Sequence, residues 1–221
     1  FDTVVRIETR DPATTMAEVI DFFCTVQTES GPIAGIGVAS FGPLNVDPQD
    51  PRYGQFFATP KPGWSEYPLR RNLVDALGLP VSVTTDVNGA LLAEAAYGAA
   101  QGISNAVYVT VGTGLGAGVL ANGHLVSGFM HPEVGHMRVA THGVEGSCPF
   151  HANCLEGLVC GPAIAKRAGK PAEQLATDDP LWDAIAVNLA DMCVNLLCVL
   201  STERIIPVSY THLTLPTKWT G

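Results

Sequence analysis

Residues 81–118 read VSVTTDVNGALLAEAAYGAAQGISNAVYVTVGTGLGAG. The β-branched run from Val81 to Thr85 predicts a strand, and the Ala- and Leu-rich segment from Gly89 to Ala100 predicts a helix. Ala106 to Val111 is a second apolar run of strand length. Strands that alternate with helices are typical of parallel sheets joined by right-handed crossovers. The stretch therefore predicts an α/β fold.

The residues before this stretch extend the same pattern. Alternating apolar and polar residues predict a strand over Phe1 to Thr9, and Thr15 with Glu18 has the spacing of a capping box at the start of a helix. Ile33 to Ser40 is a short apolar run, as expected of a buried parallel strand. The turn that follows, Phe41 to Asn45, lies where open α/β sheets bind ligands.

The residues after Asn105 form a second unit. Gly112 to Gly118 joins two predicted strands, Asn122-Gly123 is a strong hairpin signal, and Thr202 to Ile206 begins a further strand. We therefore predict an N-terminal α/β domain over residues 1–104 and a C-terminal α/β domain over residues 105–206.

The end of the chain differs in character. Val208 to Thr217, VSYTHLTLPT, resembles the translation of a sequencing-library adapter. We expect residues 207–221 to be an artefactual tail and exclude them from the fold prediction. The alternative is a genuine polar C-terminal strand.

Charge and composition restrict the possible partners. The formal net charge of −9 argues against nucleic acid or an anionic membrane surface. Leu181 to Leu200 is apolar but interrupted by polar residues, so it predicts a buried amphipathic helix rather than a membrane span. Six cysteines without a secretory signal pattern indicate a reducing compartment, and we expect a cytoplasmic protein. Four of these cysteines are expected to fill the core: Cys24, Cys160, Cys193 and Cys198.

A ligand-rich stretch runs from His131 to Glu156 and reads HPEVGHMRVATHGVEGSCPFHANCLE. Cys148, His151 and Cys154 form a C-x2-H-x2-C pattern, and His136 lies upstream. Four such ligands are the number and kind that a tetrahedral zinc ion takes. A single His or Cys often fills a core, but three at two-residue intervals favour a metal site. Because protein ligands would occupy all four positions, we expect the zinc to be structural.

Asp86 and the glycine-rich turn each allow two interpretations. Asp86 stands between a strand and a helix, where it is either an N-cap or a general base that accepts a proton from a hydroxyl. Asn88 either orients a hydroxyl or satisfies the helix start. Gly112 to Gly118, with the Thr113 hydroxyl, suits a phosphate chain, but it matches neither the P-loop nor the dinucleotide pattern. A glycine-rich hairpin without a ligand is the alternative.

Taken together, these motifs resemble the ROK family (repressor, open reading frame, kinase), and most closely its zinc-containing bacterial fructokinases. The resemblance implies an actin-like, ribonuclease-H-type fold of two α/β domains, here incomplete. It also implies transfer of the ATP γ-phosphoryl group to D-fructose, with Mg²⁺, giving fructose 6-phosphate. The matching motifs are residues 36–45, TPKPGW at 59–64, TDVN at 85–88, GTGLGAG at 112–118, HPEVGH at 131–136 and CPFHANCLE at 148–156.

The resemblance implies a role for each conspicuous residue. Asp86 becomes the general base, while Thr113 and Gly114 face the ATP phosphates. The residues expected to bind sugar hydroxyls are Asn88, Glu133, His136 and Glu156. The residues expected to hold structural Zn²⁺ are His136, Cys148, His151 and Cys154.

The chain also departs from the family pattern. Family members begin with a strand and an Asp/Glu-x-Gly-Gly-Thr-Lys phosphate loop, and they carry an adenosine loop after the strand that here reads Arg204-Ile205-Ile206. We therefore expect a chain truncated at both ends, which as written binds ATP poorly and has little kinase activity.

Other interpretations stay open. One alternative is a kinase of another hexose, such as mannose, or a broad fructo/mannokinase. The others are a sugar-sensing regulator of the same family and a zinc-stabilised binding module. The expected partners are a sugar and ATP, without nucleic acid or membrane, in a homodimer when full length.

Overall fold

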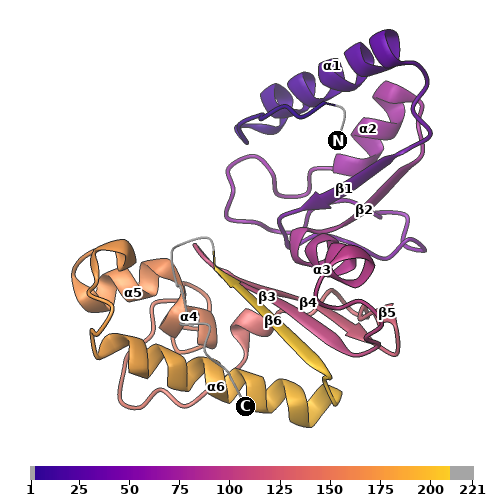
Figure 1. The fold of residues 1–221 in the computed structure, drawn as a ribbon. Coiled ribbons are helices and arrows are strands. Elements are labelled where there is room, and N and C mark those ends of the chain that lie inside the picture. The colour runs from indigo at the N-terminus through magenta and orange to yellow at the C-terminus, as the bar shows by residue number, and fades with distance from the viewer. Residues whose placement is uncertain (1–2, 210–221) are drawn as a thin grey trace. The chain divides into compact units, whose positions relative to one another are not determined.

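The computed structural model describes residues 3–209 of the chain (Figure 1). Contacts divide the chain into two compact units. The first consists of Phe1–Gly89 with Ser127–His131, and the second of Ala90–Val126 with Pro132–Gly221. This division falls inside a helix, and the domain boundary expected between residues 104 and 105 stays a prediction.

The first unit contains a parallel pair of strands, β1 (Ile36–Ser40) and β2 (Val81–Thr85), in which each residue of one strand lies opposite a residue of the other. Two helices accompany them, α1 (Pro12–Ser30) and α2 (Leu69–Leu77). Parallel strands separated by a helix confirm the α/β expectation for this region. The core of the unit is a cluster of buried apolar residues: Met16, Ile36, Leu44, Phe56, Trp64, Leu69, Leu73, Val81 and Val83.

The strand expected over residues 1–9 is wrong for the part that the structure describes. Residues 3–10 have no regular secondary structure, and nearly all of them are exposed. An extended segment becomes a strand only where a neighbour satisfies its backbone hydrogen bonds. None of the described strands pairs with residues 3–10, so the alternating pattern alone was insufficient.

The start of α1 also differs from the prediction. The helix begins at Pro12, and the carboxylate of Asp11 accepts a hydrogen bond from Thr14 N at 3.0 Å, which makes Asp11 the N-cap. The capping box expected at Thr15 and Glu18 is therefore wrong. Proline favours the first helical position because it lacks the N–H that would be unsatisfied there.

The second unit is built on a sheet of four strands: β3 (Ala106–Val111), β4 (Leu115–Ala121), β5 (His124–Leu125) and β6 (Arg204–Ser209). Their order in space is β5-β4-β3-β6; β3 runs antiparallel to β4 and parallel to β6. The turn between β4 and β5 has positive φ at Asn122 (52°) and Gly123 (78°). This backbone conformation confirms the predicted hairpin.

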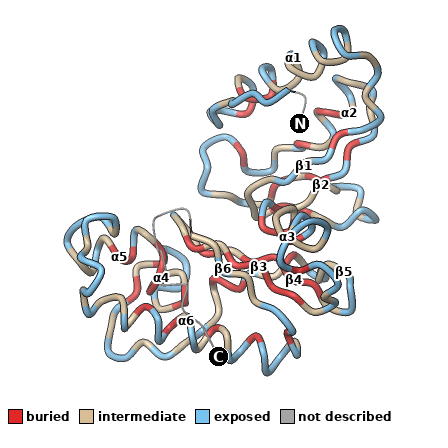
Figure 2. The backbone as a smooth tube through the Cα atoms, viewed as in Figure 1, coloured by how far each residue is buried: buried red, intermediate tan, exposed pale blue. Residues whose placement is uncertain are grey.

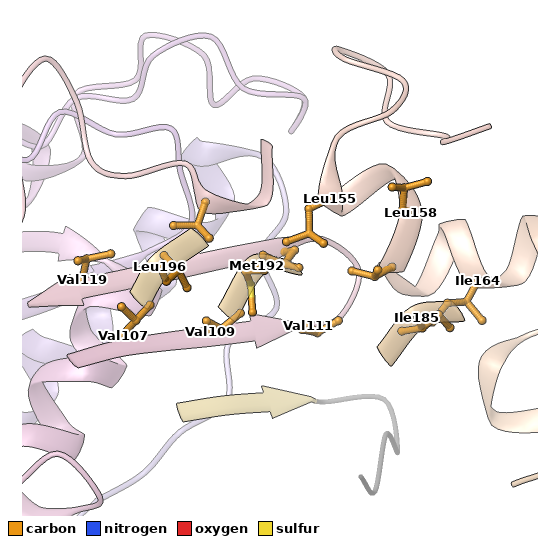
Figure 3. Packing of buried hydrophobic residues seen from close by; sticks show 14 residues of the cluster. Val107, Val109, Val111, Val119, Leu155, Leu158, Ile164, Ile185, Met192 and Leu196 are labelled. Carbon is orange, nitrogen blue, oxygen red and sulfur yellow. The ribbon is translucent and has the colours of Figure 1, made fainter. Parts of the chain in front are cut away.

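Helices complete the second unit, and their buried faces form its core with the sheet. Buried residues concentrate along β3 and β4 (Figure 2). Figure 3 shows how Val107 and Val109 of β3 pack in one cluster with Met192 and Leu196. The remaining elements of the chain are α3 (Asp86–Tyr97), η1 (Val134–His136), α4 (Leu155–Val159), α5 (Gly161–Ala168), η2 (Ala172–Gln174) and α6 (Leu181–Leu200).

Only one face of α6 is buried. Ile185, Met192 and Leu196 point into the core, whereas Val194 and Val199 are exposed. By length and composition alone α6 would also suit a membrane span, but this is weak evidence because core helices satisfy the same criteria. The expectation that all four remaining cysteines fill the core is wrong for two exposed ones, which lie on α1 and α6: Cys24 and Cys198.

The last strand is longer than predicted. β6 continues beyond Ile206 to Ser209 because β3 offers backbone partners as far as Val111. β6 lies at the edge of the sheet, where Pro207 is tolerated despite lacking an N–H. Excluding residues 207–209 from the fold was therefore wrong, and residues 210–221 of the expected tail lie outside the described residues.

Candidate functional site

The four predicted metal ligands come together in the second unit. His136, Cys148, His151 and Cys154 each offer one ligand atom, and these atoms all lie within 4.8 Å of one another. The Nδ1 atom of His136 is 3.9 Å from the sulfur of Cys148 and 3.5 Å from that of Cys154. Ligands bonded to a tetrahedral zinc ion at about 2.0–2.3 Å lie roughly 3.3–3.8 Å apart. The donor set therefore fits such an ion, and the two distances from His136 Nδ1 are close to the spacing that it needs.

Tight backbone turns bring these ligands together. Cys148 and Ala152 form an isolated antiparallel bridge with hydrogen bonds of 2.9 and 3.2 Å between them. Ala152 adopts a positive φ of 49°, which reverses the chain just after His151. The side chain of Asn153 accepts a hydrogen bond from Gly146 N at 2.7 Å and ties the two sides of the turn together. Local hydrogen bonds thus explain how the C-x2-H-x2-C spacing becomes a cluster.

The environment of the two sulfur atoms favours a bound cation. Cys154 is fully buried and Cys148 is 7% exposed. Burial raises the pKa of the Cys154 thiol, and the neighbouring Cys148 and Glu156 raise it further. Thiolates are the form that binds metal, and a divalent cation supplies the positive charge that two adjacent buried thiolates need.

Glu156 contacts the glycine-rich turn as well as standing next to the metal ligands. It lies in the first turn of α4, and its Oε2 accepts a hydrogen bond from Leu115 N at 2.9 Å. Gly161 N donates to Gly112 O at 2.8 Å, so α5 contacts the same turn. The sequence did not predict either contact, because nothing in the local pattern links positions so far apart. The nearest signal in the sequence was the glycine at position 114, because a Cβ there would lie 2.8 Å from Glu156 Oε2.

Glu133 and Thr113 are solvent-accessible in the second unit. Glu133 is exposed and immediately precedes η1, where its carbonyl accepts a hydrogen bond from His136 N at 2.9 Å. Thr113 is exposed in the turn between β3 and β4, beside half-buried Gly114. The structure thus leaves these side chains accessible to a ligand, and their predicted roles stay predictions.

Asp86 does not perform the capping role that its position suggested. It is the first residue of α3, directly after β2, and its side chain is exposed. Thr85 Oγ1 accepts a hydrogen bond from Asn88 N at 3.2 Å, the contact typical of an N-cap with the third helical residue. The helix is therefore capped by Thr85. Asp86 Oδ1 accepts a hydrogen bond from Val87 N at 2.8 Å, and the carboxylate stays exposed to solvent.

Asn88 is far more buried than its predicted contact with a sugar suggests. Only 2% of the residue is exposed, and its amide nitrogen donates to Thr84 Oγ1 at 3.2 Å. Its Oδ1 is buried and accepts no hydrogen bond within the described part of the chain. Such an atom needs a donor, so the role of Asn88 in binding a hydroxyl stays a prediction.

His131 makes a contact that the sequence did not predict. His131 is 6% exposed, and its Nε2 lies 3.4 Å from Leu44 N, so it accepts a hydrogen bond in the turn after β1. A Cβ added at Gly42 would lie 3.2 Å from the same nitrogen. The turn was predicted as a ligand site from its position alone, whereas its contact with His131 is visible only in the structure.

Comparison with solved structures establishes the fold. The ROK hexokinase from Thermus thermophilus superposes with a TM-score of 0.78 at 26% identity, over 97% of this chain and 75% of that one. This similarity confirms the predicted actin-like α/β fold. Because the match leaves part of the other protein uncovered, it also fits an incomplete version of the fold.

Comparison with curated sequences agrees. A fructokinase from Pediococcus pentosaceus is 41% identical over 205 residues, which is 91% of this chain and 69% of that protein. A fructokinase from Zymomonas mobilis is 41% identical over 210 residues, with 92% of this chain and 70% of that protein covered. The sequence pattern of the ROK family matches residues 3–207. The chain therefore belongs to the ROK family.

Proposed function

We propose that the protein is a sugar kinase that transfers the γ-phosphoryl group of ATP to D-fructose and releases fructose 6-phosphate. The observation that carries this proposal is the exposed carboxylate of Asp86. Thr85, not Asp86, is the N-cap of α3, so the carboxylate is not needed for that role. The similarity to two fructokinases supports the choice of sugar. In phosphoryl transfer, such a carboxylate accepts the proton of the attacking hydroxyl while the rest of the site positions the reactants.

The proposed structural metal is Zn²⁺ held by His136, Cys148, His151 and Cys154. When bound, it supplies a rigid cross-link rather than a reactive water, because its four positions are filled by the protein. The Nδ1 atom of His136 faces the sulfur atoms, so its Nε2 is the nitrogen that would donate to a sugar hydroxyl. The other residues proposed to bind sugar hydroxyls are Asn88, Glu133 and Glu156.

The glycine-rich turn is the proposed phosphate site. Thr113 contributes a hydroxyl and Gly114 a backbone N–H, while Mg²⁺ would neutralise the ATP phosphates. Such backbone donors suit phosphate in a protein of negative net charge. We propose a cytoplasmic enzyme that acts on small molecules, as a homodimer when full length.

The general base is tested with Asp86→Asn. Because the aligned segment covers 69% of the Pediococcus pentosaceus fructokinase, turnover is measured in a chimera that joins the flanking residues of that protein to this chain. Loss of the base should lower kcat by roughly 10²- to 10⁴-fold and leave fructose affinity, measured by calorimetry, within a few-fold of the parent. Asp75→Asn, on an exposed face of α2, is the matched control. Unchanged turnover in Asp86→Asn would refute the assignment.

The sugar is tested by phosphorylation of fructose, mannose, glucose and N-acetylmannosamine in the same chimera. The proposal expects the highest kcat/KM with fructose. A higher value with mannose would favour the kinase of another hexose. Sugar binding without turnover would favour a regulator, and neither binding nor turnover would favour a plain zinc-stabilised module.

A further inference from the structure

The glycine turn, residues 112–116, is in contact with the metal loop, residues 132–156, on two sides. On one side Glu156 Oε2 accepts the hydrogen bond of Leu115 N at 2.9 Å. On the other side the backbone of Gly135 lies so close that a Cβ there would come within 2.0 Å of Leu115 O. Both polar backbone groups of Leu115 therefore face residues of the metal loop.

The metal ligands are directly connected to these contacts. Leu155 N donates to Met137 O at 3.0 Å, which pairs the residue after Cys154 with the residue after His136. Gly135 immediately precedes the ligand His136 in η1, and Glu156 follows the ligand Cys154 by two residues in the first turn of α4. Any ion that holds His136 and Cys154 together therefore also fixes the positions of the two residues that contact Leu115.

We propose that Glu156 is a positioning residue through which the bound metal sets the conformation of the glycine turn. The carboxylate satisfies the N–H of Leu115, so that the remaining N–H groups of the turn keep a fixed direction. Loss of the metal would free Glu156 and loosen the turn. The consequence for phosphate binding rests on the proposed function, whereas the mechanical coupling itself does not.

The coupling is tested by hydrogen exchange of the Leu115 amide in the 221-residue chain, measured by NMR with Zn²⁺ and after its removal with a chelator. A hydrogen bond to a charged group is strong enough that its loss should accelerate exchange roughly tenfold or more. Glu156→Ala should show the fast exchange with Zn²⁺ still bound, and Glu156→Gln, which keeps an acceptor, should restore slow exchange. Glu145→Ala, an exposed residue of the same loop, should behave as the parent.

A second pair of variants changes residues of the glycine turn and leaves the sequence of the metal loop unaltered. A Cβ at Gly114 would lie 2.8 Å from Glu156 Oε2, whereas one at Gly112 would meet nothing within 4 Å. Gly114→Ala should therefore accelerate exchange at Leu115 with a full complement of zinc, and Gly112→Ala should not. These variants keep the proposal testable even where Glu156→Ala fails to fold.

The outcomes separate this proposal from the proposed function. Exchange at Leu115 that responds to Zn²⁺ and to Glu156→Ala, but not to Glu145→Ala, supports the coupling even where calorimetry detects no ADP binding. Exchange that ignores both Zn²⁺ removal and Glu156→Ala overturns the coupling, even where ADP binds normally. Equal acceleration by Gly112→Ala and Gly114→Ala would also overturn it.

Discussion

The region around Asp86 and the metal loop are held in place by different forces. Asp86 follows a strand paired along its whole length with β1, and its neighbours Val83 and Val87 are buried. The metal loop, residues 132–156, contains one short 3-10 helix and isolated bridges before α4 begins. A backbone ladder and apolar burial therefore fix the first region. The second is held by local hydrogen bonds and a few buried residues, and it brings four potential metal ligands together.

Removal of the metal should have the largest effect, and it should destabilise the metal loop without affecting the region around Asp86. Structural zinc contributes about 10–16 kcal/mol of apparent binding energy in small peptides. Chelation should therefore lower the unfolding midpoint of the second unit by about 10 °C or more and increase hydrogen exchange across the metal loop. Peptides that cover β1 and β2 should keep their protection. Equal loss of protection in both regions would show that they do not differ in this way.

The next effect comes from the core of the first unit. Phe56 is fully buried and stacks on Phe41 with ring centroids 4.7 Å apart. Phe56→Ala should cost about 3–5 kcal/mol of unfolding free energy, because it leaves a cavity in a packed core. Metal content, measured by mass spectrometry of the folded fraction, should stay at the parental level. Coupled loss of metal would contradict the independence of the two regions.

The smallest effect concerns the start of α3. Thr85→Ala removes the cap contact to Asn88 N and should destabilise the protein by about 1 kcal/mol in urea denaturation. Asp86→Asn should change stability by a few tenths of a kcal/mol at most, because Asp86 is exposed and Asn keeps an oxygen that can accept the hydrogen bond of Val87 N. A reversed order would restore Asp86 as the cap.

Sequence reasoning was most successful where one residue type at one spacing determines the structure. The Asn122-Gly123 hairpin was predicted because few other residues adopt positive φ there. The convergence of His136, Cys148, His151 and Cys154 was predicted because Cys and His at short intervals favour a metal site, and their binding of zinc stays a prediction. Strand β2 had its predicted bounds because a β-branched run of that length seldom forms anything else.

Sequence-based prediction failed where the structure depends on a distant partner or on the choice between two adjacent residues. Residues 3–10 alternate like a strand but lack a paired neighbour among the described strands. The cap of α3 lies one residue earlier than expected, at Thr85, and local composition does not distinguish Thr85 from Asp86. The contact of Glu156 with Leu115 joins positions that no local pattern relates.

Measurement of the metal in the purified chain tests the closed four-ligand site most directly. Protein prepared anaerobically should contain about one zinc ion per chain, and X-ray absorption should show two sulfur and two nitrogen ligands at about 2.3 and 2.0 Å. Chains without zinc, or zinc with a bound water in place of one of the four side chains, would contradict the closed site formed by His136, Cys148, His151 and Cys154.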